Sequence, residues 1–217
     1  MELQLKRLKK DVDILQKKYG HHGLSAIYGA GRIYKPTVLF LFMNPTARNV
    51  SAFSDWRGIR APWIGTKNVW KIFNKIGLMD TKIYKLIKES GQGEWSENFA
   101  QDVYENINNK SVYITNLAKC TQKDARKLND AVFKKYLKNT LKEIYFINPQ
   151  KIISFGNQVS SILLNRKIKV SEYKDKGKEV LFIKDKKLDV YPVYYPVGQG
   201  ARNMNKAIKR IKYILSH

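Results

Sequence analysis

Apolar positions along the chain follow two spacings, one typical of helices and one typical of buried strands. Near the start, Leu5, Leu8, Val12 and Leu15 recur every three or four residues, which predicts an amphipathic helix over residues 2–18. Four later segments are rich in apolar residues and end in loops of Asn, Gly or Pro; they are residues 37–45, 111–117, 151–156 and 189–196. Such segments predict strands that are buried on both faces.

Helical patterns lie between and after these strands, at residues 68–76, 98–107, 124–147, 157–164 and 203–215, the last of them basic. Strands that alternate with helices favour a parallel sheet with helices on both faces. We therefore expect an α/β fold, a three-layer α/β/α domain with a central four-stranded parallel sheet, over residues 1–217. The lysine-rich segment 166–187, with apolar residues in its middle, predicts an exposed hairpin.

Composition narrows the class of protein. The chain has 217 residues, of which 43% are hydrophobic and 27% charged, as expected for one soluble globular domain. Its longest apolar run, Val38 to Met43, is far shorter than the roughly 20 residues of a membrane span, and the N-terminal helix is too charged for a secretory signal. The lone Cys120 excludes an internal disulfide and multi-cysteine metal sites. We expect a cytoplasmic monomer, nucleoid-associated if prokaryotic, without metal or cofactor.

The charge balance points to a class of partner. The chain carries 41 Lys and Arg against 18 Asp and Glu, a formal net charge of +23. Such an excess suits a polyanion, although a solvated surface in a generally basic proteome would also produce it.

The strand ends carry the candidate chemistry, because ligands of parallel α/β sheets bind beyond the carboxyl ends of the strands. The first strand ends in Phe42-Met43-Asn44-Pro45-Thr46, and Arg60-Ala61-Pro62-Trp63-Ile64-Gly65 precedes the next helix. The second strand runs into Thr115-Asn116-Leu117-Ala118-Lys119-Cys120, and the fourth runs into Tyr195-Pro196-Val197-Gly198-Gln199-Gly200.

In this order the four segments resemble the uracil-DNA glycosylase superfamily, over roughly residues 38–215. Members have a Gly-x-Asn-Pro-Gly type loop, a Pro-Phe-x-Gly segment, a strand ending in Thr-Asn-x-x-Lys and a late His-Pro-Ser type loop. The resemblance implies a monofunctional DNA glycosylase that flips a nucleotide out of single- or double-stranded DNA. Such an enzyme hydrolyses the N-glycosidic bond of uracil or another deaminated base and leaves an abasic site.

The resemblance also implies roles for single residues. Asn44 would orient the attacking water, and Tyr195 would donate a hydrogen bond to O2 of the base. Met43, Trp63 and Asn116 would contact the base, with the Asn116 amide accepting from N3–H of uracil and donating to O4. Two plainer interpretations stay open: one is that Trp63 packs its loop, and the other is that Asn116 bonds its own backbone.

Contacts with DNA are expected from the late loop and the last helix, at Gln199, Gly200, Arg202 and Lys206. Lys209, Arg210 and Lys212 follow at helical spacing and are expected to neutralise backbone phosphates, although a solvated helix face would have the same composition. Asp55 is an alternative group for activating water, or else a turn or cap residue.

The sequence departs from the family pattern in three places. Tyr195 stands where many members have His, and Thr46 stands where Gly is usual. Only Cys120 remains of the four cysteines that the iron–sulfur branches need. These departures leave two alternatives: a catalytically weak or inactive member that binds nucleic acid, and an enzyme that acts on RNA or a free nucleotide.

Overall fold

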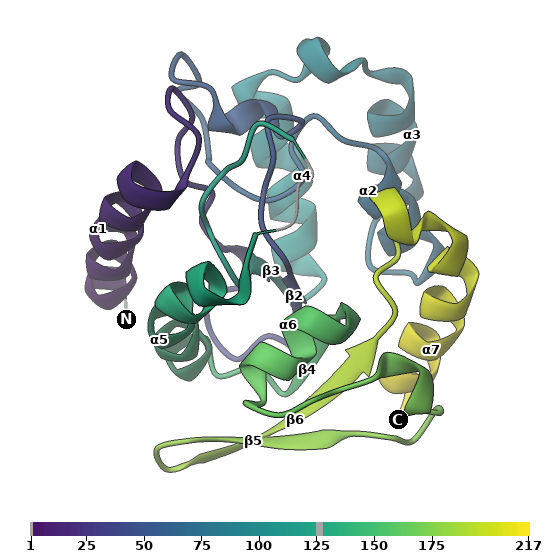
Figure 1. Cartoon of the computed structure of the whole chain (residues 1–217). Helices are drawn as coiled ribbons and strands as arrows, with labels where there is room; N and C mark the ends of the chain where they lie inside the picture. The colour runs from purple at the N-terminus through teal and green to yellow at the C-terminus, as the bar shows by residue number, and fades with distance from the viewer. Residues whose placement is uncertain (1, 125–127) are drawn as a thin grey trace.

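The core of the molecule is a twisted sheet with helices on both faces (Figure 1). The computed structural model describes residues 2–124 and 128–217, except for the side chain of Gln199. Within these residues the sheet has six strands in the order β1-β3-β2-β4-β6-β5. Their bounds are β1 Ala30–Gly31, β2 Val38–Phe42, β3 Val112–Asn116, β4 Lys151–Phe155, β5 Glu179–Ile183 and β6 Lys186–Val193. The four central strands, β3-β2-β4-β6, are parallel, as predicted, and short antiparallel strands extend both edges.

Two sets of helices cover the two faces. One face carries α1 (Glu2–Tyr19), α5 (Asp130–Ile147) and α6 (Gly156–Leu163), and we call it the α5 face. The other carries α2 (Asn68–Lys75), α3 (Thr81–Glu89), α4 (Glu97–Asn109) and α7 (Met204–Ser216), and we call it the α2 face. The predicted three-layer α/β/α fold is thus confirmed.

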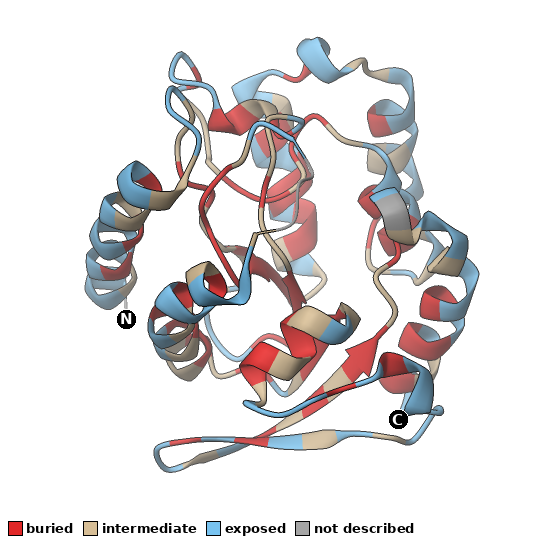
Figure 2. Cartoon of the chain, viewed as in Figure 1, coloured by how far each residue is buried: buried red, intermediate tan, exposed pale blue. Residues whose placement is uncertain are grey.

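The central strands are apolar throughout because each side of the sheet is covered. All five residues of β2 are buried; Leu39 and Leu41 belong to the cluster on the α5 face, whereas Phe40 and Phe42 belong to the cluster on the α2 face. Figure 2 shows this burial in the middle of the sheet. Since side chains alternate along a strand, two neighbouring residues at a strand end point to opposite faces of the sheet.

Several predicted boundaries need correction. The helix expected over 124–147 begins at Asp130, because Asn129 caps it by accepting a hydrogen bond from the backbone N–H of Val132 at 3.0 Å; residues 125–127 of that range lie outside the described part. Helix α3 was not predicted. The hairpin expected over 166–187 consists of β5 and the first half of β6, and only one of its faces is exposed, because Leu181, Ile183 and Leu188 pack on the α5 face.

The two terminal helices lie close to their predicted ranges. Helix α1 ends one residue later than expected, and α7 begins at Met204 after a 3-10 segment over Gly198–Asn203. Across the described residues, no helix combines the length and the apolar character that a membrane span requires.

Candidate active site

The predicted site residues meet at the carboxyl ends of the central strands. Phe42, the last residue of β2, is paired in register with Asn116, the last residue of β3. The rings of Trp63 and Tyr195 both contact Phe42 edge-on, with centroid distances of 4.9 and 6.4 Å. Asn44 follows Phe42 by two residues. The structure therefore gathers Asn44, Trp63, Asn116 and Tyr195 around the end of β2.

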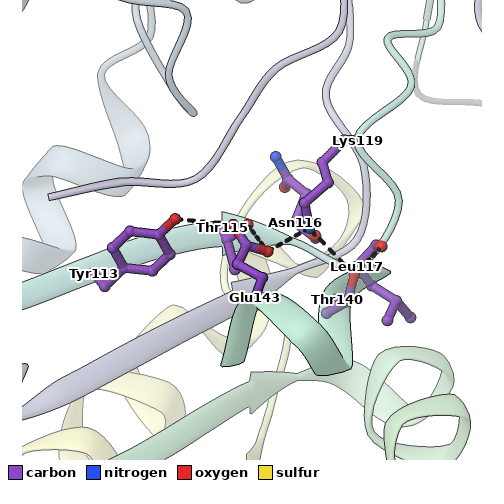
Figure 3. A network of polar contacts seen from close by, with 7 residues as sticks. All are labelled: Tyr113, Thr115, Asn116, Leu117, Lys119, Thr140 and Glu143. Carbon is purple, nitrogen blue, oxygen red and sulfur yellow. Dashed lines mark hydrogen bonds and ion pairs between the residues drawn. The ribbon is translucent and has the colours of Figure 1, made fainter. Parts of the chain in front are cut away.

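Asn116 has an unusual environment for a buried polar residue. Only 2% of it is exposed, yet its side-chain amide forms no hydrogen bond with any described residue. In Figure 3 the amide group points away from the dashed contacts, which involve the main chain of Asn116 instead. Part of the small exposed area of the residue lies on this amide, so the amide is not sealed off and is available to a ligand. The alternative that it bonds its own backbone is not what the structure shows.

The loop that carries Asn44 is tied to the loop after β3. The N–H of Ala118 donates to the carbonyl of Met43 at 2.9 Å, and the N–H of Gln122 donates to the carbonyl of Pro45 at 3.1 Å. The Asn44 side-chain Nδ2 donates to the carbonyl of Pro45 at 3.1 Å, which leaves its Oδ1 without a protein partner. Asn44 thus presents a fixed amide whose oxygen is free to accept.

Met43 and Thr46 flank this residue. Met43 packs against the cluster on the α5 face, opposite to the face of Trp63, so the structure does not bring it together with the other predicted base contacts. Thr46 forms a bridge with Gln122 and its φ is not positive, so its backbone does not require the glycine that is usual in the family.

Trp63 is held in a constrained loop. Its φ of 69° lies in the left-handed region, which is rare for a bulky residue and favours a functional explanation. Its carbonyl accepts from the indole N–H of Trp70 at 3.1 Å and from the hydroxyl of Thr66 at 2.7 Å. The hydroxyl of Tyr104 donates to the carbonyl of Pro62 at 2.6 Å. The half-buried indole is thereby fixed, while its own N–H is buried without a partner.

Arg60 completes this loop and was missed by the sequence analysis. Its guanidinium donates to the carbonyls of Ser51, Phe53 and Trp56 at 2.5, 2.9 and 3.0 Å. Arg60 therefore holds the loop around Asp55 through hydrogen bonds to main-chain carbonyls, without an ion pair. Asp55 itself is exposed and makes no hydrogen bond or ion pair with any described residue.

Tyr195 lies against the sheet beside the turn into α6. The φ of Gly156 is +86°, and a Cβ there would lie 3.5 Å from the Cβ of Tyr195. Burial raises the pKa of Tyr195 above its usual value of 10, so the phenol keeps its proton and can donate a hydrogen bond. Gly200 is required by close approach, because a Cβ there would lie 2.1 Å from the carbonyl oxygen of Tyr195.

The predicted DNA contacts follow on the 3-10 segment and α7. Arg202 and Lys206 are exposed, as are Lys209 and Lys212 further along α7. The side chain of Gln199 lies outside the described part. No acidic residue follows Asp189 in the sequence, so this surface is basic.

Arg210, which the helical spacing grouped with these lysines, is different. It is 5% exposed, and its guanidinium donates to the carbonyls of Tyr173, Lys174 and Gly177, the last at 2.7 Å. Burial lowers the pKa of Arg210. The expectation that it contacts phosphate is wrong, because the guanidinium holds the loop before β5 instead.

Metal ligands and cavities are further features that bear on the chemistry of the part of the chain that the structure describes. The described residues contain no group of three or more His, Cys, Asp or Glu that could hold a metal ion. A cavity of about 230 Å³ lies on the α5 face, between α1 and α5, and its lining does not include Asn44, Trp63, Asn116 or Tyr195.

Comparison with known proteins gives one finding. The family model described as the uracil DNA glycosylase superfamily matches residues 28–215, nearly the whole chain. A search of curated proteins found no match. The family match covers all four strand-end segments and supports a glycosylase-type function on DNA.

Proposed function

The chain belongs to the uracil DNA glycosylase superfamily, and from this premise we propose that it hydrolyses the N-glycosidic bond of uracil or another deaminated base in DNA. The base leaves the stack, enters the site at the ends of β2 and β3, and is released to leave an abasic site.

The observation that carries this proposal is the amide of Asn116, which has no protein partner although only 2% of the residue is exposed. An amide offers an acceptor oxygen and a donor nitrogen side by side, and uracil offers the complementary pair, N3–H and O4. Cytosine presents the reverse pattern at these positions, so an amide of fixed orientation rejects it. With only 2% of Asn116 exposed, the surrounding loops must separate slightly to admit a base.

Trp63 supplies the face of the proposed pocket. Aromatic side chains bind flipped bases by stacking, which depends on area rather than on hydrogen-bond pattern. Because the loop of Trp63 is pinned by Trp70, Thr66 and Tyr104, the indole is already ordered before a base arrives. Such pre-ordering lowers the entropy cost of binding.

The chemistry needs a water molecule at the sugar and stabilisation of the departing base. Asn44 Oδ1 accepts a hydrogen bond from the water and fixes its position, although an amide is too weak a base to remove a proton outright. Protonated Tyr195 donates to O2 of the base, where negative charge develops. Rate acceleration in this site therefore derives mainly from positioning and electrostatics.

A single-turnover assay tests the proposal. Labelled oligonucleotides carry uracil, hypoxanthine or xanthine, single-stranded or opposite each base, and alkali reveals abasic sites. We expect cleavage of at least one substrate by the wild-type chain and its loss in Asn44→Ala, with DNA affinity retained. Asn109→Ala, at an exposed position of α4 away from the site, is the matched control and retains activity.

The outcomes separate the alternatives. No cleavage at enzyme excess, with binding intact at low salt, identifies an inactive binding protein and makes Tyr195→His the variant to test for restored activity. Cleavage confined to matched RNA oligonucleotides would show that the substrate is RNA and that the proposal of DNA is wrong. Equal activity of Asn44→Ala and wild type removes Asn44 from the mechanism.

A further inference from the structure

Directly behind Asn116, on the α5 face, lies a buried network of charged and polar side chains (Figure 3). Its centre is an ion pair between Lys119 Nζ and Glu143 Oε2 at 2.8 Å, with residue exposures of 3% and 5%. Glu143 comes from the C-terminal half of α5, whereas Lys119 comes from the loop after β3. The network thus joins a helix to the strand end that carries the candidate base-reading residue.

The hydrogen-bonding capacity of Lys119 is used completely. Its three ammonium protons have three acceptors: the main-chain oxygen of Asn116 at 2.6 Å, Thr140 Oγ1 at 3.2 Å and Glu143 Oε2 at 2.8 Å. Thr140 in turn donates to the carbonyl of Leu117 at 2.9 Å. Two consecutive carbonyls at the end of β3 are therefore held, that of Asn116 by Lys119 and that of Leu117 by Thr140 of α5.

Glu143 is fixed by β3 itself. The hydroxyl of Tyr113 donates to Oε1 at 2.9 Å, and the hydroxyl of Thr115 lies 3.2 and 3.1 Å from the two carboxylate oxygens. The chain also passes very close here, since a Cβ at Gly29 would lie 2.4 Å from Glu143 Oε1. The carboxylate therefore has little freedom to move.

Strand geometry relates this network to the site. Tyr113 and Thr115 point to the α5 face, so Asn116, the next residue, turns its amide to the α2 face, where Phe42 and Trp63 lie. A buried ion pair contributes less to stability than apolar residues of similar volume often would, so stability alone is a poor explanation for it.

We infer that Glu143 is a positioning residue, which acts through Lys119 and Thr140 to fix the main chain at Asn116 and hence the direction of its amide. This inference rests on the proposed function, because it assigns the network to base recognition by Asn116. The network contacts the strand from behind and does not touch the base.

Substitutions at Thr140 provide a matched pair. Thr140→Val keeps the shape and removes the hydroxyl, whereas Thr140→Ser keeps the hydroxyl. In single turnover we expect Thr140→Val and Glu143→Gln to lose about 10- to 100-fold in the cleavage rate at saturation, with DNA affinity unchanged, because small misplacements of a recognition group cost this much. Thr140→Ser stays within about threefold of wild type, since the bond to the Leu117 carbonyl survives.

A purely structural role predicts a different pattern. It would lower the folded fraction of each variant, and the rate per folded molecule would be unchanged. Tyr113→Phe is the control for this case, because it removes a bond to the same carboxylate without touching Lys119. Equal rates per folded molecule for Thr140→Val and Thr140→Ser would overturn the inference.

A second measurement does not need activity. The N–H groups of Leu117 and Ala118 donate to the carbonyls of Phe42 and Met43 at 2.8 and 2.9 Å, and their hydrogen exchange reports on the end of β3. We expect faster exchange at both amides in Thr140→Val and Glu143→Gln than in Thr140→Ser. If wild type cleaves nothing, the proposed function fails while this comparison still decides whether the network holds the strand end; equal exchange in all variants refutes it.

Discussion

Truncation of the candidate base-reading residue should leave the fold about as stable as before. Only 2% of Asn116 is exposed, and this small part includes the amide, which has no protein partner. A fully enclosed amide without a hydrogen bond would cost about 1–3 kcal/mol of folding free energy, and contact with solvent reduces this cost. Asn116→Ala removes what remains of the cost and loses packing worth about 1 kcal/mol. The expected change in the free energy of unfolding is therefore within about 1 kcal/mol of zero.

Asn106 is the matched control because it is also buried, at 8% exposure, and both of its amide atoms have a protein partner. Its Nδ2 donates to Asp80 Oδ2 at 2.6 Å, and its Oδ1 accepts from the Asp80 backbone N–H at 3.2 Å. Asn106→Ala should therefore lower the free energy of unfolding by about 1–3 kcal/mol. In a chain of this length each kcal/mol shifts Tm by about 2–4 °C.

Urea unfolding followed by circular dichroism measures both variants, and the single-turnover assay measures their activity. We expect Asn116→Ala to lose cleavage without losing stability, and Asn106→Ala to lose stability while keeping its rate per folded molecule. Equal destabilisation by the two substitutions would refute the reasoning, because it would show that the amide of Asn116 is bonded in the folded protein.

Three further predictions concern the rest of the chain. Arg210→Met should lower the free energy of unfolding by about 3 kcal/mol in urea titrations, because it leaves the loop carbonyls unbonded, whereas Lys209→Ala at the exposed neighbouring position should change it by less than about 0.5 kcal/mol. Lys206→Ala should reduce the slope of log Kd for DNA against log salt concentration by about 1, and an unchanged slope would exclude a phosphate contact. Burial raises the pKa of Tyr104 in the folded protein well above the value near 10 of the unfolded chain. The stability that the protonated Tyr104 contributes is therefore complete below pH 10 and is lost as the pH rises further. The fall in the free energy of unfolding between pH 10 and 11.5 should be shallower in Tyr104→Phe than in wild type.

The layers of the fold were predictable because they depend on local patterns. Continuous apolar segments such as β2 are needed wherever a strand is covered on both faces, and the sequence shows this directly. Helix α3 was missed because it is mostly exposed, with Ile87 as its buried residue. The start of α5 was misplaced because the cap at Asn129 depends on one side-chain contact.

The sequence predicted the residue types of the candidate site better than it predicted the buried residues that hold them in place. The spacing of Tyr136, Thr140, Glu143 and Ile147 places all four on one face of α5, and a glutamate within such an apolar stripe signals a buried partner. That signal was present in the sequence. The identity of the partner, Lys119, was not, because it depends on how the loop after β3 folds back.

The same limit explains why Arg210 was assigned wrongly and Asn116 was left between two interpretations. Helical spacing places Arg210 beside exposed lysines, but its role depends on carbonyls more than 30 residues earlier in the chain. For Asn116 the sequence supplies a polar residue at a strand end, and a hydrogen bond to its own backbone would have made it a structural residue. What distinguishes the two cases is the state of pairing. Two nitrogens of the Arg210 guanidinium donate to three carbonyls, whereas the amide of Asn116 lies at the exposed edge of a buried residue, without a protein partner, near a constrained indole. Folding energy accounts for the first arrangement and gains nothing from the second, so a ligand is the better explanation for the second.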